Sequence, residues 1–392
     1  MTTACEVPTL TAPTAPRLLT GQFGRLLFTV FGSALSMYLL TSVVPLYLAA
    51  SGSGGIGAGL STGAMMLSAV GVELLVPRML ARWGCQVVLG LGLILLGAPS
   101  LVLLVTASLP LVLAVCVVRG AGLAILVVGA VALIAEVTPA HRRGEAFGIY
   151  GIVVGLPAAI GLPLGVYLTA VIGFDALFVF AAAASLVGLV ALGGMPRQPS
   201  VEEQHVKVLG GLRGSGLLMP TFVFAAVTVA AGISVTFLPL AVAENNQSLV
   251  ATALLMQAIT APGARWLAGR YGDRVGPAKL LPAALILAAL GAGALILIGS
   301  AAAIVVGSTL FGIGFGAAQN LTLSLMYNCV PKSRYGQVSA LWNLAYDGGW
   351  GIGAIVFGAI VAGTGYSLAF GLTAVIVAAA IVPAVQSLRS RT

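Results

Sequence analysis

Apolar stretches of about twenty residues, separated by short polar segments, recur along the whole chain. A helix of about twenty apolar residues crosses the hydrocarbon core of a bilayer, whereas membrane β-strands would alternate apolar and polar positions, a pattern that is absent here. The pattern therefore predicts an all-α membrane protein with twelve transmembrane helices. The predicted spans are 26–48, 57–77, 86–107, 109–134, 147–170, 176–195, 217–242, 248–268, 279–299, 301–326, 337–360 and 366–386.

The second half of the chain resembles the first at a fixed offset of 192 residues. Shared apolar composition explains matching Leu and Ala residues, but it does not explain charged and Pro residues at the same loop positions. The loop matches are Arg78, Arg82, Gly84, Pro139, Arg142 and Gly144 with Arg270, Arg274, Gly276, Pro331, Arg334 and Gly336. A parallel repeat of this kind suits alternating access, in which one half rocks against the other. The alternative is an ancestral duplication kept only for packing.

The repeat and the polar segments together predict the organisation of the chain. Residues 1–23, rich in Thr and Pro and without an apolar core, are expected to form a disordered cytoplasmic tail and not a cleaved signal peptide. Residues 24–195 and 217–388 are expected to form two six-helix bundles, joined by the cytoplasmic linker 196–216.

The charges agree with a membrane protein. Only 7% of the residues are charged, too few for the surface of a soluble domain. Of the 18 Lys and Arg residues, all except Arg119 lie in the two tails and alternate loops, or close to them. By the positive-inside rule, this face of the protein is cytoplasmic. We therefore expect a plasma-membrane protein with both termini in the cytoplasm. The net charge of +8 thus reflects the membrane topology and suits contact with anionic lipid. It gives no support for a nucleic-acid partner.

Two charged residues are predicted deep in the membrane. Arg119 and Asp347 each lie about ten residues, or roughly 15 Å, from one end of a predicted span. Charges at this depth are costly unless they face a partner or a wet cavity, so both are candidate proton or substrate residues, with a structural ion pair as the alternative. Further polar or aromatic residues are expected to face a central cavity because they follow helical spacing or lie alone in a span. These are Tyr38, Gln257, Gln319, Asn320, Asn343, Tyr346 and Trp350.

Three short motifs resemble those of a known family. The segment GRYGDRVG at 269–276 is similar to the signature G-x-x-x-D-R-x-G of the major facilitator superfamily, and the equivalent segment in the first half keeps only Arg82 and Gly84. The segment VRGAG at 118–122 resembles the motif whose Arg is associated with proton coupling. The segment GLPAAIGLPLG at 155–165 resembles the antiporter signature G-P-x-x-G-G in part, with Gly161 and Gly165 in place and the Pro displaced to Pro163. Its glycines and prolines are expected to let the predicted helix 147–170 bend and pack closely on the predicted helix 248–268. Over residues 24–388 the chain resembles the drug and sugar efflux permeases of this superfamily.

The dense polar segment near residue 270 is expected to form a cytoplasmic gate. Asp273 can lie against the N-terminus of the predicted helix 147–170, where negative charge is favoured, and Arg270 and Arg274 can pair with Glu136 or Glu145. Ordinary topogenic charge is the alternative. The predicted gate residues are Glu73, Arg82, Gly84, Glu145, Arg265, Gly269, Asp273, Arg274 and Gly276. Glu73, the repeat equivalent of Arg265, is expected to pair with a basic residue, to titrate, or only to reach water.

These features predict a secondary active transporter, most readily a proton-coupled antiporter that exports a small organic molecule. A proton symporter or facilitator for uptake is the alternative. A membrane-embedded enzyme is not expected, because the spans show no His, no Ser–His pair and no carboxylate dyad. A membrane sensor is a further alternative, although no regulatory domain is visible. No metal site, disulfide or cofactor is expected from four Cys and two His residues, and the resemblance implies a monomer.

Overall fold

The computed structural model describes residues 21–138, 142–193, 216–242, 246–331 and 334–389, and every regular element within these ranges is helical, as predicted. Nearly all of the predicted tail 1–23 and linker 196–216 lies outside the described residues, although residues 21–23 already belong to the first helix. The elements are α1 (Gly21–Leu48), η1 (Ala49–Ser53), α2 (Gly54–Glu73), α3 (Val76–Trp83), α4 (Cys85–Gly97), η2 (Ala98–Leu104), α5 (Leu109–Val137), α6 (Arg143–Leu186), α7 (Gly188–Leu192), α8 (Leu218–Ala241), α9 (Gln247–Val275), α10 (Pro277–Ala294), η6 (Leu295–Leu297), α11 (Ala301–Asn328), α12 (Tyr335–Thr364), α13 (Tyr366–Ala379) and α14 (Ile381–Arg389).

Nine stretches of the described residues are long and apolar enough to cross a membrane. Two of them, Gly21–Glu73 and Gly148–Leu192, each contain two predicted spans and a break between them. The breaks lie at Gly52, with φ 91°, and at Gly173, with φ 80°. The predicted span 248–268 lies in α9, which is not among the nine because uncharged polar residues such as Gln247 and Gln257 lower its mean hydropathy. Nine stretches and twelve predicted spans therefore differ through two merged pairs and one more polar helix.

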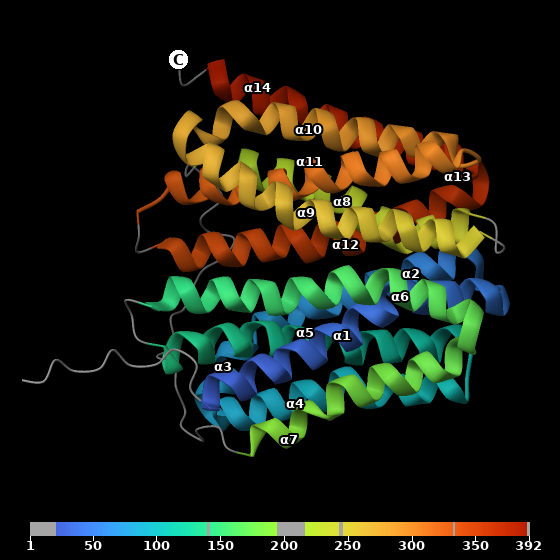
Figure 1. Cartoon of the computed structure of the whole chain (residues 1–392), viewed down its shortest axis with the longest axis vertical. Helices are drawn as coiled ribbons and strands as arrows, with labels where there is room; N and C mark the ends of the chain where they lie inside the picture. Colours follow the sequence, from blue (N-terminus) through green and yellow to red (C-terminus); the bar gives the residue numbers. More distant parts are fainter. Residues whose placement is uncertain (1–20, 139–141, 194–215, 243–245, 332–333, 390–392) are drawn as a thin grey trace, which may run out of the picture.

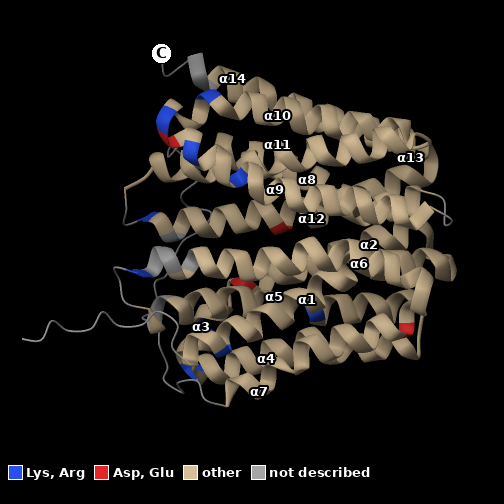
Figure 2. Ribbon diagram, in the orientation of Figure 1, with Lys and Arg blue, Asp and Glu red and all other residues tan. Residues whose placement is uncertain are grey.

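The helices pack side by side with their axes roughly parallel (Figure 1). Helices α1 to α7 occupy the lower part of the view and α8 to α14 the upper part, and the two groups meet where α2 and α6 contact α12 and α9. Lys and Arg gather at one end of the helices (Figure 2). We call this the basic end, marked by Arg82, Arg270 and Arg274, and the opposite end the far end.

Close helix contacts repeat at the offset seen in the sequence. A side chain on Gly120 would overlap the carbonyl oxygen of Met65, and one on Gly312 would lie 2.8 Å from the carbonyl oxygen of Gln257, the residue equivalent to Met65. Because neither glycine has room for a Cβ, α5 packs directly against the backbone of α2, and α11 packs directly against the backbone of α9. The duplicated glycines thus make equivalent contacts in the two groups of helices.

The duplicated turn glycines also share a conformation. Gly84 and Gly276 have φ values of 77° and 98°, and Gly173 and Gly365 have values of 80° and 76°. Residues with a Cβ rarely adopt positive φ, so glycine is required at these tight connections. The turns at Gly84 and Gly276 lie at the basic end, where α3 meets α4 and α9 meets α10.

A seam of small residues joins the two groups of helices near the far end. It consists of Gly55, Gly59 and Gly63 of α2 with Gly351, Ala354 and Gly358 of α12, and we call it the glycine seam. A side chain on Gly358 would lie 2.5 Å from the carbonyl oxygen of Gly55, so the two backbones are in contact. Small residues at four-residue spacing allow such an approach in membrane helices. Beside the seam, the Thr62 and Thr236 hydroxyls are 3.1 Å apart and hydrogen bonded.

Candidate functional site

A cavity with two connected lobes lies between the two groups of helices. The polar lobe has a volume of about 240 Å³ and contains the charged residues Glu73, Arg265 and Asp347. The apolar lobe, of about 840 Å³, lies mainly between α6 and α9. Both lobes are lined by Tyr38, Tyr150, Val154, Arg265, Gln319 and Tyr346. The shared lining makes them one cavity, to which α1, α6, α9, α11 and α12 all contribute.

The cavity extends toward the basic end. Gly148, Gly151 and Gly155, in the first turns of α6, line the apolar lobe, and a side chain on any of them would meet no atom within 4 Å. At the far end, the glycine seam leaves no comparable space between α2 and α12. The described conformation is thus open between α6 and α9 near the basic end and closed along the seam.

A carboxyl pair joins the two groups of helices across the polar lobe. Glu73 is the last residue of α2, and Asp347 lies in the first half of α12. Their side chains line the same lobe and interact electrostatically. Two ionised carboxylates in one cavity repel each other, which favours the binding of a proton by the pair. The expectation that the spans hold no carboxylate dyad is therefore wrong, because residues 274 positions apart in the sequence meet here.

Arg265 lies in the same lobe. Its guanidinium donates a hydrogen bond of 3.2 Å to Oε1 of Gln319 and lies 5.8 Å from the ring centroid of Trp342, a cation–π distance. No ion pair within 4 Å joins Arg265 to Glu73 or Asp347, all three of which are described. The sequence placed Glu73 and Arg265 at the gate, but the structure places both side chains in the cavity.

Aromatic rings form a ladder along the cavity face of α12. Trp342, Tyr346 and Trp350 follow each other at four-residue spacing, with neighbouring ring centroids 5.7 and 5.6 Å apart. Trp342 lines the polar lobe and Trp350 the apolar lobe, whereas Tyr346 lines both. Helical spacing predicted this shared face, which also carries Asn343 and Asp347. The ladder therefore offers flat apolar contacts from one lobe to the other.

The amide side chains predicted for the cavity do line it, but most are held by protein groups. Gln257 is buried and accepts a hydrogen bond of 3.0 Å from Ser234, Gln319 accepts from Arg265, and Asn320 accepts from Ser324 at 3.3 Å. The sequence did not single out Tyr150 and Phe315, which also line the cavity. Neither belongs to a polar stripe, so no pattern in the sequence pointed to them.

Arg119 lies apart from this cavity. It is only 1% exposed, and its guanidinium donates to the carbonyl oxygens of Leu96 at 2.6 Å and Ser36 at 3.2 Å and to the hydroxyl of Ser100. The void beside it, of about 20 Å³, is too small for a solute. The geometry thus makes Arg119 a tie between α5, α4, η2 and α1, where the sequence expected it to face the watery crevice or to pair with an acid.

The glycines of the 155–165 motif have a different neighbour from the expected one. A side chain on Gly161 would lie 3.0 Å from Cβ of Tyr38, and one on Gly165 would overlap the carbonyl oxygen of Leu39. Both contacts are to α1, whereas the sequence expected close packing on α9, which runs along the other side of α6. Pro163 lies inside α6 between them. The motif therefore fixes α6 on α1 and leaves its opposite side to the cavity.

The gate residues at the basic end form no site within the described residues. Arg82, Asp273 and Arg274 are exposed, and a side chain on Gly269 would lie 2.9 Å from Nδ2 of Asn320, within the upper group of helices. The side chains of Glu136 and Glu145, the expected ion-pair partners, lie outside the described residues. The ion pairs predicted for the cytoplasmic gate therefore lie outside the described residues and stay a prediction.

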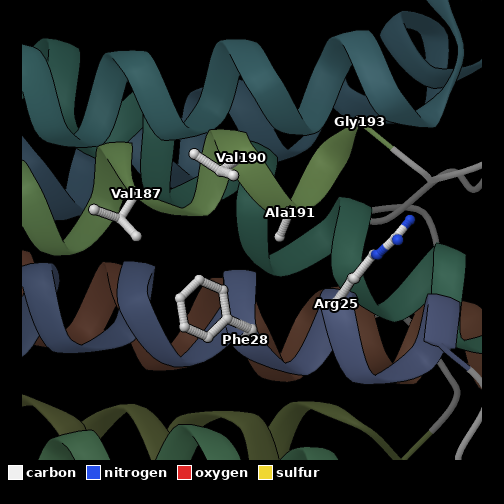
Figure 3. A pocket seen from close by; sticks show the side chains of 6 residues that line it. All are labelled: Arg25, Phe28, Val187, Val190, Ala191 and Gly193. Carbon is white, nitrogen blue, oxygen red and sulfur yellow. The ribbon is translucent and has the colours of Figure 1, made fainter.

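Two further features bear on binding. A groove on the outside of the helices, between α1 and α7, is lined by Arg25, Phe28, Val187, Val190, Ala191 and Gly193 (Figure 3). Its exposed apolar side chains, including Val190 at 84% exposure, are typical of a lipid-facing surface. Across the described ranges, no group of three or more His, Cys, Asp or Glu residues could hold a metal ion. The central cavity is thus the candidate binding site for a solute.

The comparisons with known proteins agree with this architecture. The family model described as Major Facilitator Superfamily matches residues 26–354 and, separately, residues 267–391. No curated protein sequence matches the chain. A solved structure of a bacterial homologue of the human lysosomal transporter Spinster, in an inward-facing and occupied conformation, has a TM-score of 0.76 at 16% identity, with 94% of this chain and 96% of that chain covered.

Two other solved structures are similar to the same extent. A mutant of the nucleoside transporter NupG has a TM-score of 0.75 at 13% identity, with coverages of 93% and 99%. A POT family transporter in complex with a thioalcohol-conjugated peptide has a TM-score of 0.74 at 14% identity, with coverages of 93% and 95%. At these identities the likeness concerns the fold alone.

Proposed function

Because the chain belongs to the major facilitator superfamily of secondary transporters, we propose that it is a proton-coupled antiporter that exports a small organic molecule by alternating access. The observation that carries the proposal is the pair of acids Glu73 and Asp347, which line one lobe of the cavity between the two groups of helices. Repulsion between two ionised carboxylates favours a proton on this pair, and a charged solute in the same lobe would compete with that proton. The proton site is thus built from both groups of helices.

A rocking motion of the two groups of helices would make this coupling possible. Residues 24–195 and 217–388 would rock against each other, because their main contacts are α2 with α12 and α6 with α9. In the described conformation the cavity extends toward the basic end, which the positive-inside rule assigns to the cytoplasm of the plasma membrane. Loading from the cytoplasm supports export. The proposed exporter is a monomer with both termini in the cytoplasm. The gate residues Asp273, Arg274 and Glu145 would act when this end closes.

Uptake by proton symport is the second candidate. The same carboxyl pair could bind a proton together with a solute instead of in exchange for it, and only the 155–165 motif favours exchange. The solutes of the similar structures, a nucleoside and a peptide, differ widely, so the fold does not fix the chemistry of the solute. The direction of flux relative to an imposed proton gradient separates the two candidates.

The test is solute flux into proteoliposomes under an imposed pH gradient, with a chemically diverse panel of organic solutes. We expect at least one solute to move against the proton flow, and we expect Asp347→Asn to abolish this movement. Asp175→Asn, at an exposed position of α6 just after the break at Gly173, is the matched control and should keep wild-type flux. Flux in wild type and Asp347→Asn that ignores the pH gradient would refute proton coupling at this site, and movement with the protons would favour symport.

A further inference from the structure

We propose that Glu73, Asp347 and Arg265 form a charge-selective site that exchanges one proton for one organic cation bearing a single positive charge. The inference deepens the proposed function and rests on it. The charged residues that line the cavity are its basis. Among the described residues lining the two lobes, Glu73 and Asp347 are the only acids and Arg265 is the only Lys or Arg.

The carboxyl pair provides one exchangeable position for positive charge. With both carboxyl groups ionised and the guanidinium of Arg265 charged, the polar lobe carries one net negative charge, which a single proton on the pair neutralises. A cation that replaces this proton adds one positive charge while the proton's charge leaves. The total charge of the site is then unchanged, which matters because net charge is costly in a cavity within the membrane.

Arg265 determines the net charge of the polar lobe. Its guanidinium lies in the polar lobe without an ion pair to either carboxyl group, held instead by Gln319 and the ring of Trp342. Its positive charge therefore balances the one negative charge of the protonated pair. The other polar groups facing the pair are the phenols of Tyr38, Tyr150 and Tyr346 and neutral amides, none of which is charged near neutral pH.

The balance fails for a doubly charged solute. With both carboxyl groups ionised and Arg265 in place, a monocation leaves the polar lobe neutral, whereas a dication leaves one uncompensated positive charge. Arg265 thus acts as a selectivity residue against dications. The same reasoning makes the exchange electroneutral, because one proton crosses the membrane for each monocation.

The shape of the cavity narrows the cation further. The rings of Trp342, Tyr346 and Trp350 form a ladder beside the carboxyl pair, and π faces attract organic cations as well as flat apolar groups. Arg265 already covers Trp342 and Trp350 is buried, so the half-buried ring of Tyr346, which lines both lobes, remains for a solute. The apolar lobe, at about 840 Å³, can hold the hydrophobic body of such a molecule. The expected solute is a flat aromatic monocation.

The experiment uses the full chain in proteoliposomes and two flat pyridinium ions of similar size, methylphenylpyridinium with one charge and methyl viologen with two. With the membrane potential clamped at zero, a pH gradient should drive methylphenylpyridinium at least about tenfold faster than methyl viologen. A membrane potential without a pH gradient should drive no net exchange. Equal rates for the two ions, or exchange driven by potential alone, would overturn the inference.

Variants of Arg265 isolate its part. Arg265→Gln removes the charge and should raise the ratio of methyl viologen to methylphenylpyridinium transport by about tenfold, whereas Arg265→Lys keeps the charge and should keep the wild-type ratio. Equal ratios in the two variants would show that the residue acts through packing and would overturn its proposed role. A thermal unfolding curve for each variant confirms that the compared proteins are folded.

The outcomes separate this inference from the function on which it rests. Proton-driven movement of neutral or anionic solutes alone would overturn the monocation site and leave the antiporter standing. Proton-driven movement of no solute in the panel would overturn both. Glu73→Gln should abolish proton-linked movement of methylphenylpyridinium as fully as Asp347→Asn does. If Glu73→Gln keeps wild-type exchange, the pair is not the site of the proton.

Discussion

Gly59 of α2 lies so close to the carbonyl oxygen of Ala354 of α12 that a side chain at residue 59 would overlap it. This contact lies in the middle of the glycine seam, and the carboxyl pair Glu73 and Asp347 lies on the same two helices, nearer the basic end. Any motion that opens the far end must separate α2 from α12. Packing at the seam and charge in the cavity are thus linked through one helix pair.

Gly59→Ala is expected to disfavour the described conformation. The methyl group cannot be accommodated without moving α2 from α12, and overpacking of this kind costs about 1–3 kcal/mol. Thr62, buried beside the seam, offers a reporter. In a Thr62→Cys background, Gly59→Ala should increase labelling by a membrane-impermeant thiol reagent added from the far end.

Gly71→Ala is the matched control for the seam. Gly71 lies on the same helix, and a side chain there would meet no atom within 4 Å. The substitution should leave labelling of Thr62→Cys unchanged and stabilise the helix by up to about 1 kcal/mol. Similar labelling in the two alanine variants would show that the seam does not close the far end.

Arg119→Leu is expected to reduce stability. The substitution leaves the oxygens of Leu96, Ser100 and Ser36 without their charged donor, and hydrogen bonds to charged groups contribute about 1.5–3 kcal/mol each. Thermal unfolding in detergent should show a loss of at least about 3 kcal/mol, against less than about 0.5 kcal/mol for Arg25→Gln at the exposed end of α1. Unchanged stability combined with lost proton coupling would instead support the role that the VRGAG motif implies.

Glu73→Gln and Asp347→Asn are expected to be non-additive. If the two carboxyl groups hold one proton as a unit, each single substitution should lower proton-driven flux by at least about tenfold, and the double variant should be no worse than either. Initial rates of flux in proteoliposomes at one protein density provide the comparison. Independent, multiplying effects would mean that the two groups act in separate steps.

Gly276→Ala should strain the turn between α9 and α10. Gly276 has φ 98° and ψ 129°, a region that residues with a Cβ rarely adopt and that costs them about 1–3 kcal/mol. Gly263→Ala, within α9 and with open space around it, should be neutral or slightly stabilising. Thermal unfolding of the two variants tests this, and equal midpoints would argue against a strained turn at the gate.

Much of the fold could be predicted because membrane helices carry their signal locally. Apolar length predicted the all-α class, and the positions of Lys and Arg predicted that one end of the helices is basic. The repeat also has structural consequences, since Gly84 and Gly276 share a positive φ. Helical spacing placed Asn343, Tyr346, Asp347 and Trp350 on one face, which lines the cavity.

The partners of these residues could not be predicted. The repeat aligned Glu73 with Arg265, but it gave no indication that Glu73 meets Asp347 on the opposite group of helices. Depth in the membrane made both Arg119 and Asp347 candidate proton or substrate residues. In the structure, Arg119 is buried among backbone oxygens, whereas Asp347 faces a cavity. Depth is a property of one helix, whereas the direction of a side chain depends on the neighbours of that helix.

By itself, the sequence determined which segments lie in the membrane, which end is basic and which residues repeat, because each depends only on residues close together in the chain or on a fixed offset. The tertiary structure alone decided that Glu73 joins Asp347, that Arg265 stays free of both, and that Gly161 packs on α1. These relationships depend on how each helix is rotated and on which helices touch. That rotation is set by the close approach of small residues such as Gly59 to a distant backbone, which no local pattern encodes.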